Sequence, residues 1–267
     1  MSTRNREIKA VPTNIITGFL GVGKTSTILH LLENKPWNER WAVLVNEFGE
    51  IGVDGSLFQG QHAEEQGVFI REVPGGCMCC ASGLPMQIAL NMLLARAQPD
   101  RLLIEPTGLG HPIEVLQVLS AEHYREILSL QKIITLVDAR KLKDERYTKN
   151  ETFNQQIAIA DVVVGNKQDY YQAGDEARLI QYAQLHASKD IPLIFAKQGC
   201  IDINLLTGAT ESFVKGTHQH ATTNFAQLLP EVPIPKCGYL KARNSGEGYE
   251  SVGWRFSSEF TFNRFKL

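Results

Sequence analysis

A glycine-rich stretch near the start of the chain has the residue types and spacing that hold phosphate groups. Residues 18–25 read G-F-L-G-V-G-K-T and fit the G-x-x-x-x-G-K-[S/T] pattern in full. Glycines let the backbone curl until successive N–H groups point at phosphate oxygens, and a following helix adds its positive N-terminus. In this pattern Lys24 reaches the β- and γ-phosphates, and the Thr25 hydroxyl binds magnesium. The expected nucleotide contacts here are Gly18, Gly21, Val22, Gly23, Lys24, Thr25 and Ser26.

A second pattern indicates which base the nucleotide carries. The apolar run at 162–164 leads into N-K-Q-D at 166–169. An aspartate in this place accepts hydrogen bonds from N1 and N2 of guanine, whereas adenine lacks both donors and would leave the carboxylate unpaired. Ala196-Lys197, after the next expected strand, is a candidate second base-binding loop. The residues expected to contact guanine are Asn166, Lys167 and Asp169.

Residues 101–108, R-L-L-I-E-P-T-G, have the character of a strand that ends in an acid. Glu105 would hold magnesium together with Thr25, or position the attacking water, and the Gly108 N–H would meet the γ-phosphate. The alternative is a Glu105 that only caps a strand end. His111 is open to three roles: orienting water, binding metal or capping the next helix. The candidate catalytic residues are Lys24, Thr25, Glu105 and Gly108.

Three closely spaced thiols form the most unusual feature of the chain. Residues 75–80 read G-G-C-M-C-C, which places Cys77, Cys79 and Cys80 within one turn. Thiolates select a soft or borderline ion, Zn²⁺ first and Cu(I) second, and three ligands leave the fourth position open, which suits delivery. Inert buried cysteines or a redox pair are the alternatives.

Two further segments offer ligands that could complete a metal site. Residues 46–54, N-E-F-G-E-I-G-V-D, carry three acids directly after an expected strand. Glu50 is the candidate fourth zinc ligand, and one of these acids is a candidate for magnesium; a solvated acidic loop is the alternative. His218 and His220 are candidate auxiliary metal ligands, with a plain polar linker as the other interpretation.

The elements that must position these groups alternate between strand and helix. Near-continuous apolar strands and intervening helical segments indicate a parallel sheet with crossover helices. We therefore expect an α/β fold, a P-loop NTPase with a mainly parallel sheet covered by helices on both faces. The expected strands are 14–17, 41–45, 101–104, 133–137, 162–164 and 192–195, and the expected helices are 25–33, 84–97, 112–119, 152–160 and 175–187.

The character of the chain changes after about residue 207. We expect a P-loop domain over residues 1–208, a linker over 209–247 that contains Pro230, Pro233 and Pro235, and the start of a smaller C-terminal domain over 248–267. A strand beginning near residue 248 and a partial helix cannot bury a core alone, so this last piece is expected to be incomplete.

Composition excludes several classes of function. A net charge of −2, from 27 basic and 29 acidic residues, gives no basic surplus for nucleic acid. The apolar runs are too short to span a membrane, and no secretory signal opens the chain. Five cysteines, three of them clustered, are typical of a metal or redox site rather than a disulfide framework, so a cytoplasmic protein is expected.

The set of motifs as a whole resembles a known family. GFLGVGKT, NEFGEIGVDG, GGCMCC, LLIEPTGLGHP and NKQD occur in the order seen in CobW-type GTPases, which are GTP-dependent metal chaperones. The runs SGLPMQ and NSGEGY make the chain most similar to the zinc-associated YeiR-like branch. The resemblance covers roughly residues 12–254. The chain departs from many relatives by Val45 in place of a glutamate, by its few histidines, and by ending at Leu267.

The resemblance implies a GTPase with slow intrinsic hydrolysis, zinc at Cys77, Cys79 and Cys80, and nucleotide-gated transfer of zinc to a client protein. In this hypothesis GTP and Mg²⁺ order residues 46–54 and 105–108, and hydrolysis relaxes them and releases zinc. The expected partners are GTP or GDP, zinc and an unidentified client metalloprotein, with a homodimer as a further candidate. Three alternatives remain: a cobalt, nickel or cofactor-assembly GTPase, a nucleotide-binding zinc buffer or sensor, and a P-loop kinase or ATPase.

Overall fold

The structure is a computed structural model, and it describes residues 8–45, 61–73, 84–187, 190–212, 239–246 and 249–256. The chain divides into two compact units, residues 1–218 and 219–267. The predicted zinc ligands and auxiliary metal ligands lie outside the described residues; these are Glu50, Cys77, Cys79, Cys80, His218 and His220.

The first unit is built on a seven-stranded sheet with the strand order β3-β2-β4-β1-β5-β6-β7. Every neighbouring pair is parallel, so the expected α/β class with a parallel sheet is confirmed. The strands are β1 (Val11–Gly18), β2 (Trp41–Val45), β3 (Val68–Glu72), β4 (Arg101–Glu105), β5 (Leu128–Val137), β6 (Val162–Gly165) and β7 (Leu193–Phe195).

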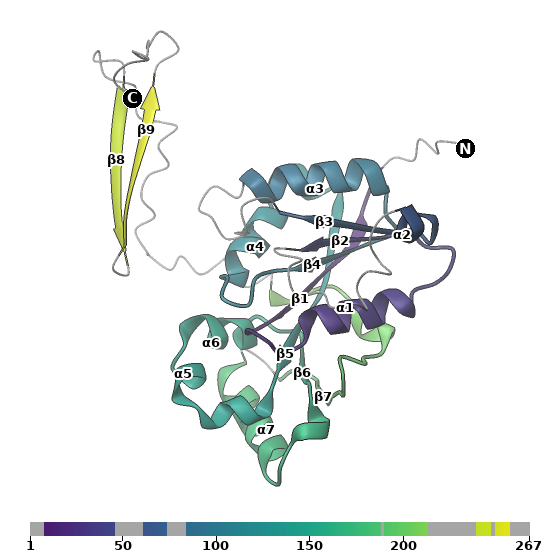
Figure 1. The fold of residues 1–267 in the computed structure, drawn as a ribbon, viewed down its shortest axis with the longest axis vertical. Helices are drawn as coiled ribbons and strands as arrows, with labels where there is room; N and C mark the ends of the chain where they lie inside the picture. Colours follow the sequence, from purple (N-terminus) through teal and green to yellow (C-terminus); the bar gives the residue numbers. More distant parts are fainter. Residues whose placement is uncertain are drawn as a thin grey trace. The chain divides into compact units, whose positions relative to one another are not determined.

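Helices cover both faces of this sheet (Figure 1). The helices α3 and α4 pack on one face and α1 packs on the other. None of the helices in the described ranges is long and apolar enough to cross a membrane. The α-helices are α1 (Lys24–Glu33), α2 (Gln61–Glu65), α3 (Leu84–Ala97), α4 (Pro112–Leu119), α5 (Glu145–Thr148), α6 (Glu151–Ala158) and α7 (Asp175–His186). Short 3-10 turns are η2 (Glu122–Tyr124), η3 (Ala139–Lys143), η4 (Gln168–Tyr170) and η5 (Ile203–Leu206).

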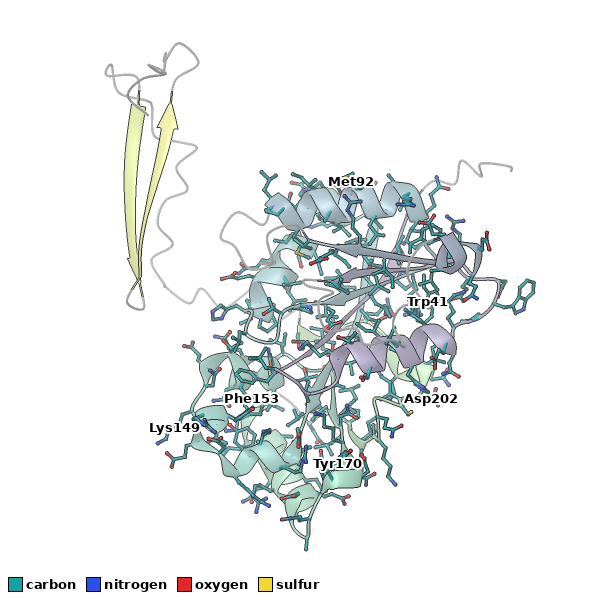
Figure 2. The ribbon with its side chains drawn as sticks, in the orientation of Figure 1. Trp41, Met92, Lys149, Phe153, Tyr170 and Asp202 are labelled. Carbon is teal, nitrogen blue, oxygen red and sulfur yellow. The ribbon has the colours of Figure 1, made fainter. Side chains whose placement is uncertain are left out.

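The strand β2, second from one edge of the sheet, illustrates why the apolar runs in the sequence predict strands buried on both faces. All five of its residues are buried. Ala42 and Leu44 join the core beneath α3 and α4, while Trp41 and Val43 join the core on the side of α1. Figure 2 shows Trp41 inside the unit, on the α1 side. Alternate residues thus supply two separate cores, which leaves no room for a polar side chain along the strand.

The register of the strands brings their carboxyl ends to one edge. Gly18 at the end of β1 pairs with Leu136, Val45 pairs with Glu105, and Val137 pairs with Gly165. The sheet order reverses at β1, which lies between β4 and β5, and the crevice outside such a switch point is where α/β sheets bind ligands.

Two strands of this sheet differ most from the sequence-based expectation, and the short helices α2 and α5 were not predicted. The strand β3 was not predicted, because it is an edge strand whose last residues, Arg71 and Glu72, are charged and half-buried or exposed. The strand β5 begins at Leu128, five residues before the predicted start at Ile133. Its first half carries polar residues and is recognisable only through its pairing with β1, which begins at Val11 opposite Leu128.

The packed part of the first unit continues beyond residue 208. Ala209 bridges to Gln131, and the Ser212 hydroxyl donates to the Ile159 carbonyl at 2.7 Å. In the second unit, β8 (Tyr239–Gly246) and β9 (Tyr249–Phe256) form an antiparallel pair. The strand at β9 was expected, whereas β8 lies in the segment that the sequence predicts as a linker. The division into domains stays a prediction.

Candidate functional site

The phosphate loop joins the end of β1 to the start of α1, as its sequence predicts. Gly18 has φ 144° and Gly23 has φ 101°, a left-handed region that disfavours side chains. A Cβ at Gly18 would lie 2.5 Å from the Leu136 carbonyl oxygen, and one at Gly23 would lie 2.6 Å from the Asn166 side-chain nitrogen. Both glycines are therefore required by backbone conformation and by close neighbours, which keeps the loop tightly curled under the start of α1.

The two residues expected to hold magnesium are already in contact across 80 positions of sequence. The Thr25 hydroxyl donates to Glu105 Oε1 at 3.0 Å, and Oε2 lies 3.3 Å away. Burial raises the pKa of the Glu105 carboxyl, while the nearby Lys24 ammonium and the Thr25 hydrogen bond lower it. A hydroxyl and a carboxylate are hard oxygen donors of the kind that Mg²⁺ prefers, so this pair fits that ion.

The turn after β4 lies directly against the phosphate loop. The Gly110 N–H donates to the Thr107 carbonyl at 3.1 Å, which closes a turn around Gly108. A Cβ at Gly108 would lie 2.8 Å from the Leu20 backbone nitrogen. The structure thus brings Gly108 to the phosphate loop at a distance that only a glycine permits, which is consistent with the contact to the γ-phosphate that we expect of it.

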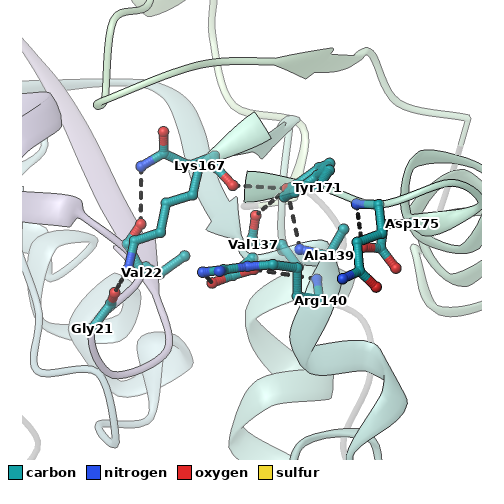
Figure 3. Close-up of polar contacts among 11 residues, drawn as sticks. Gly21, Val22, Val137, Ala139, Arg140, Lys167, Tyr171 and Asp175 are labelled. Carbon is teal, nitrogen blue, oxygen red and sulfur yellow. Dashed lines mark hydrogen bonds and ion pairs between the residues drawn. The ribbon is translucent and has the colours of Figure 1, made fainter. Parts of the chain in front are cut away.

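The N-K-Q-D loop is bonded to the phosphate loop from the other side. The Asn166 side chain is 1% exposed; its Nδ2 donates to the Val22 carbonyl at 2.9 Å, and its Oδ1 accepts from the Gly199 N–H at 3.0 Å. Lys167 Nζ reaches the Gly21 carbonyl at 2.6 Å, as Figure 3 shows. The loop expected to bind guanine and the loop expected to bind phosphate therefore form one connected structure.

Ala196-Lys197, the candidate second base loop, lies beside the N-K-Q-D loop. The Ala196 carbonyl accepts from the Gln168 N–H at 3.0 Å, and the Ala196 N–H donates to the Gly165 carbonyl at 3.0 Å. An open hollow of about 430 Å³ has Asp169 and Lys197 in its lining, together with residues of the segment 168–176. The structure therefore brings together the two loops that the sequence assigned to the base.

Tyr171 is a supporting residue that the sequence did not single out. Its hydroxyl lies 2.7 Å from the Asn166 carbonyl, to which it donates, and accepts from the Ala139 N–H at 3.1 Å (Figure 3). Burial raises the pKa of Tyr171 to about 12. The side chain thereby ties the base loop to the segment after β5. Its partners are backbone groups, which leave no signature in the sequence.

Among the described residues, no group of three or more His, Cys, Asp or Glu side chains could hold a metal ion. The predicted thiolates and Glu50 fall outside those residues. His111 precedes α4, and its side chain makes no capping hydrogen bond. Instead, its Nδ1 lies 3.3 Å from Gln155 Oε1 on α6.

Comparison with known families and proteins places this geometry in context. The family described as CobW/HypB/UreG, nucleotide-binding domain, matches residues 12–192. Zinc chaperone YeiR of Escherichia coli (strain K12) is 43% identical over 259 residues, which cover 94% of this chain and 76% of that protein. Zinc chaperone YjiA of the same organism is 34% identical over 203 residues, which cover 73% of this chain and 60% of that protein.

A solved structure supports the fold. The crystal structure of Zn(II)-bound YjiA GTPase from E. coli superposes with a TM-score of 0.55 at 26% sequence identity. The superposition covers 75% of this chain and 62% of that one. The chain thus spans most, but not all, of the length of the relatives that it matches.

Proposed function

This chain belongs to the CobW/HypB/UreG family of nucleotide-binding domains, and on that premise we propose that it is a GTP-dependent zinc chaperone. The observation that carries the nucleotide half of this proposal is the bonding of the base loop to the phosphate loop. Lys167 contacts Gly21, and Asn166 contacts Val22. A base held at Asp169 and phosphates held at Lys24 would therefore be bound by two loops that are hydrogen-bonded to each other.

Guanine is the base that this loop favours. The Asp169 carboxylate would accept from the two adjacent donors of guanine, and adenine would leave it without them. The Gln168 bond to Ala196 keeps the loop beside Lys197, whose side chain shares the hollow with Asp169. The proposal therefore includes a preference for GTP over ATP.

Hydrolysis of the γ-phosphate would rest on positioning and charge. Thr25 and Glu105 would hold Mg²⁺, which neutralises charge on the β- and γ-phosphate oxygens when it is bound with GTP. Lys24, 9% exposed beneath the loop, would place an ammonium on the same oxygens. Gly108, against Leu20, would present its N–H to the γ-phosphate. Each group lies on or beside the curled loop, so little rearrangement is needed to enclose the phosphates.

The zinc half of the proposal rests on the thiol cluster and on the relatives. Cys77, Cys79 and Cys80 have the ligand chemistry of a zinc site, and Glu50 is the proposed fourth ligand. The two E. coli relatives compared above are named zinc chaperones. The segments that carry these ligands follow β2 and β3, whose carboxyl ends lie at the same edge as Glu105. Both segments therefore start from the edge of the sheet that carries Glu105.

The proposal extends to partners and location. The zinc ligands would pass the ion to a client metalloprotein, and His218 and His220 would assist its capture. A reduced thiol cluster implies a reducing compartment, so the cytoplasm is the proposed location.

Zinc titration in three nucleotide states tests the proposal. Competitive zinc binding is measured without nucleotide, with GDP and with a non-hydrolysable GTP analogue. A shift in zinc affinity between states is expected, and by linkage zinc must then shift nucleotide affinity by the same factor. Identical zinc affinity in all three states would count against gating and in favour of a zinc buffer or a plain GTPase.

Two further measurements separate the parts of the proposal. Replacing Cys79 and Cys80 together by alanine should abolish tight zinc binding and leave GTP binding intact. Surviving zinc affinity would show that the site is elsewhere. A ratio of GTP to ATP affinity near one would contradict the role given to Asp169 and revive the kinase or ATPase alternative.

A further inference from the structure

Two neighbouring glutamines on α6 reach the turn that follows β4. Gln156 is 1% exposed, and its Nε2 donates to the Gly108 carbonyl at 3.1 Å. Gln155 Oε1 lies 3.3 Å from His111 Nδ1, at the end of the same loop. Nothing in the sequence pattern assigns these side chains to the nucleotide site, because they lie more than 40 positions beyond the turn.

The bond from Gln156 fixes one particular peptide unit. In a trans peptide the Gly108 carbonyl and the Leu109 N–H are coplanar and point in opposite directions. Gln156 holds the carbonyl, and the Thr107 hydroxyl accepts from the Leu109 N–H at 3.1 Å. This unit is the central peptide of the turn closed by Thr107 and Gly110. The orientation of that peptide distinguishes one β-turn type from another.

The glutamine itself is held by the sheet. Its backbone carbonyl accepts from the Thr135 hydroxyl on β5 at 2.7 Å. On the other side of the turn, a Cβ at Gly108 would lie 2.8 Å from Leu20 N and 3.0 Å from Leu20 Cα. The turn is therefore enclosed between a side chain anchored on the sheet and the backbone of the phosphate loop.

The side chain of Gln156 also carries a buried polar atom without a partner in the described ranges, and such atoms occur on β1 and α4 as well. Gln156 Oε1, Thr17 Oγ1 and Glu114 Oε2 are buried and bond to nothing among the described residues. Thr17 is the register neighbour of Thr135, and Glu114 lies in the first turn of α4. Unpaired buried polar atoms cost free energy, and in native proteins they call for a structural or functional reason. In Gln156 the Oε1 acceptor is used by no described residue, while Nε2 of the same amide donates to the Gly108 carbonyl.

We propose that Gln156 is a positioning residue for GTP hydrolysis, which acts by fixing the peptide that joins Gly108 to Leu109 and with it the place of Gly108 against the phosphate loop. This inference rests on the proposed GTPase function. While the γ-phosphate is present, Nε2 holds the Gly108 carbonyl. Once phosphate has left, the peptide can turn over, and the unused Oε1 then accepts the Leu109 N–H. Gln156 thereby offers a partner to both orientations of the turn.

The test compares two variants of Gln156 by steady-state GTP hydrolysis in the full chain. Gln156→Met keeps the size of the side chain and removes the donor. We expect kcat to fall about tenfold or more, with KM and GDP affinity changed less than about threefold. In Gln156→Glu a protonated carboxyl can donate to the Gly108 carbonyl and an ionised one cannot. The ratio of its kcat to that of the wild type should therefore rise as pH falls.

Ser212→Ala is the matched control, because it removes a hydroxyl bond to a backbone carbonyl just after α6, that of Ile159, and leaves Gln156 and Thr135 in place. Its kcat should equal that of the wild type. The positioning role is overturned if Gln156→Met hydrolyses GTP at the wild-type rate, if Ser212→Ala loses as much activity, or if the Gln156→Glu ratio is flat with pH. Should Gln156→Met not fold, the pH-dependent ratio of Gln156→Glu decides. An inactive wild type would instead overturn the proposed function, and this inference with it.

Discussion

The two ends of the candidate nucleotide site are held in different ways. At the base end, both side-chain polar atoms of Asn166 are bonded, and the hydroxyl of Tyr171 donates and accepts. At the phosphate end, the Gln156 amide that holds the Gly108 carbonyl has an unused Oε1, and Thr17 Oγ1 on β1 and Glu114 Oε2 on α4 also lack partners in the described part of the chain.

This difference matches what changes in a nucleotide cycle. The base is the same in GTP and GDP, so a loop that reads it gains from being fixed. The γ-phosphate is present in one state only, so the turn that we propose to contact it needs two arrangements of similar free energy. A loop whose polar atoms are all hydrogen-bonded is suited to reading the base. A turn next to an unused acceptor is suited to responding to the γ-phosphate.

The largest effect on stability and on GDP affinity should come from replacing Asn166 at the base end. Asn166→Ala leaves the Val22 carbonyl and the Gly199 N–H without their buried partner. We expect the free energy of unfolding to fall by about 2 to 4 kcal/mol, and GDP affinity to fall at least about tenfold. Urea denaturation and nucleotide titration measure the two. The exposed Asn204, replaced by alanine, is the control. If Asn166→Ala were as stable as the wild type and bound GDP as tightly, the base end would not be held in place by this side chain.

Gly108→Ala should act on catalysis far more than on stability. Its Cβ would meet the backbone of Leu20, so the turn must move away from the phosphate loop. We expect kcat to fall about tenfold to a hundredfold, with GDP affinity nearly unchanged. Gly67→Ala is matched to it, since its Cβ would lie 2.9 Å from the Glu39 carbonyl oxygen, before β3. Equal loss of kcat in both variants would point to general destabilisation.

Tyr171→Phe should produce a moderate loss confined to the base end. The Ala139 N–H and the Asn166 carbonyl lose a buried partner, which should lower the free energy of unfolding by about 1 to 2 kcal/mol. GDP affinity should fall less than in Asn166→Ala. Tyr182→Phe removes a hydroxyl bonded at 2.6 Å to Asn154, away from the base loop, and should leave affinity unchanged. Chemical denaturation with parallel GDP titration distinguishes the two tyrosines.

The smallest effect on nucleotide binding is expected from Asp175, next to the base loop, whose contribution to stability is lost in strong acid. Asp175 accepts from Lys143, the Gln172 N–H and Arg178, and these bonds lower the pKa of its carboxyl to about 2. Because the folded pKa lies below the unfolded value of about 3.9, its contribution is complete above pH 4 and is lost as pH falls towards 2. The difference in free energy of unfolding between wild type and Asp175→Asn, measured by denaturation at each pH, should therefore shrink as the pH falls from 4 to 2. A difference that stays constant down to pH 2 would contradict the lowered pKa.

Much of the fold and of the site followed from local patterns. Alternating apolar and helical segments predicted the parallel sheet, because strands such as β2 are buried on both faces and must be apolar throughout. The phosphate loop and the N-K-Q-D motif were recognisable because the residues of each pattern lie within a few consecutive positions. The strand β3 was missed because an edge strand with a charged end resembles a loop in sequence.

Only the tertiary structure revealed the residues that support the site. Tyr171 meets Ala139 across 32 positions, and Gln156 meets Gly108 across 48. The partners of Gln156 and Tyr171 are backbone carbonyl and N–H groups, which every residue carries, so no sequence pattern can mark them. The sequence by itself determined which chemistry the loops carry. The packing of α6 and the order of the strands decided which distant side chains hold those loops in place, because hydrogen bonds depend on distance in space and not on distance along the chain.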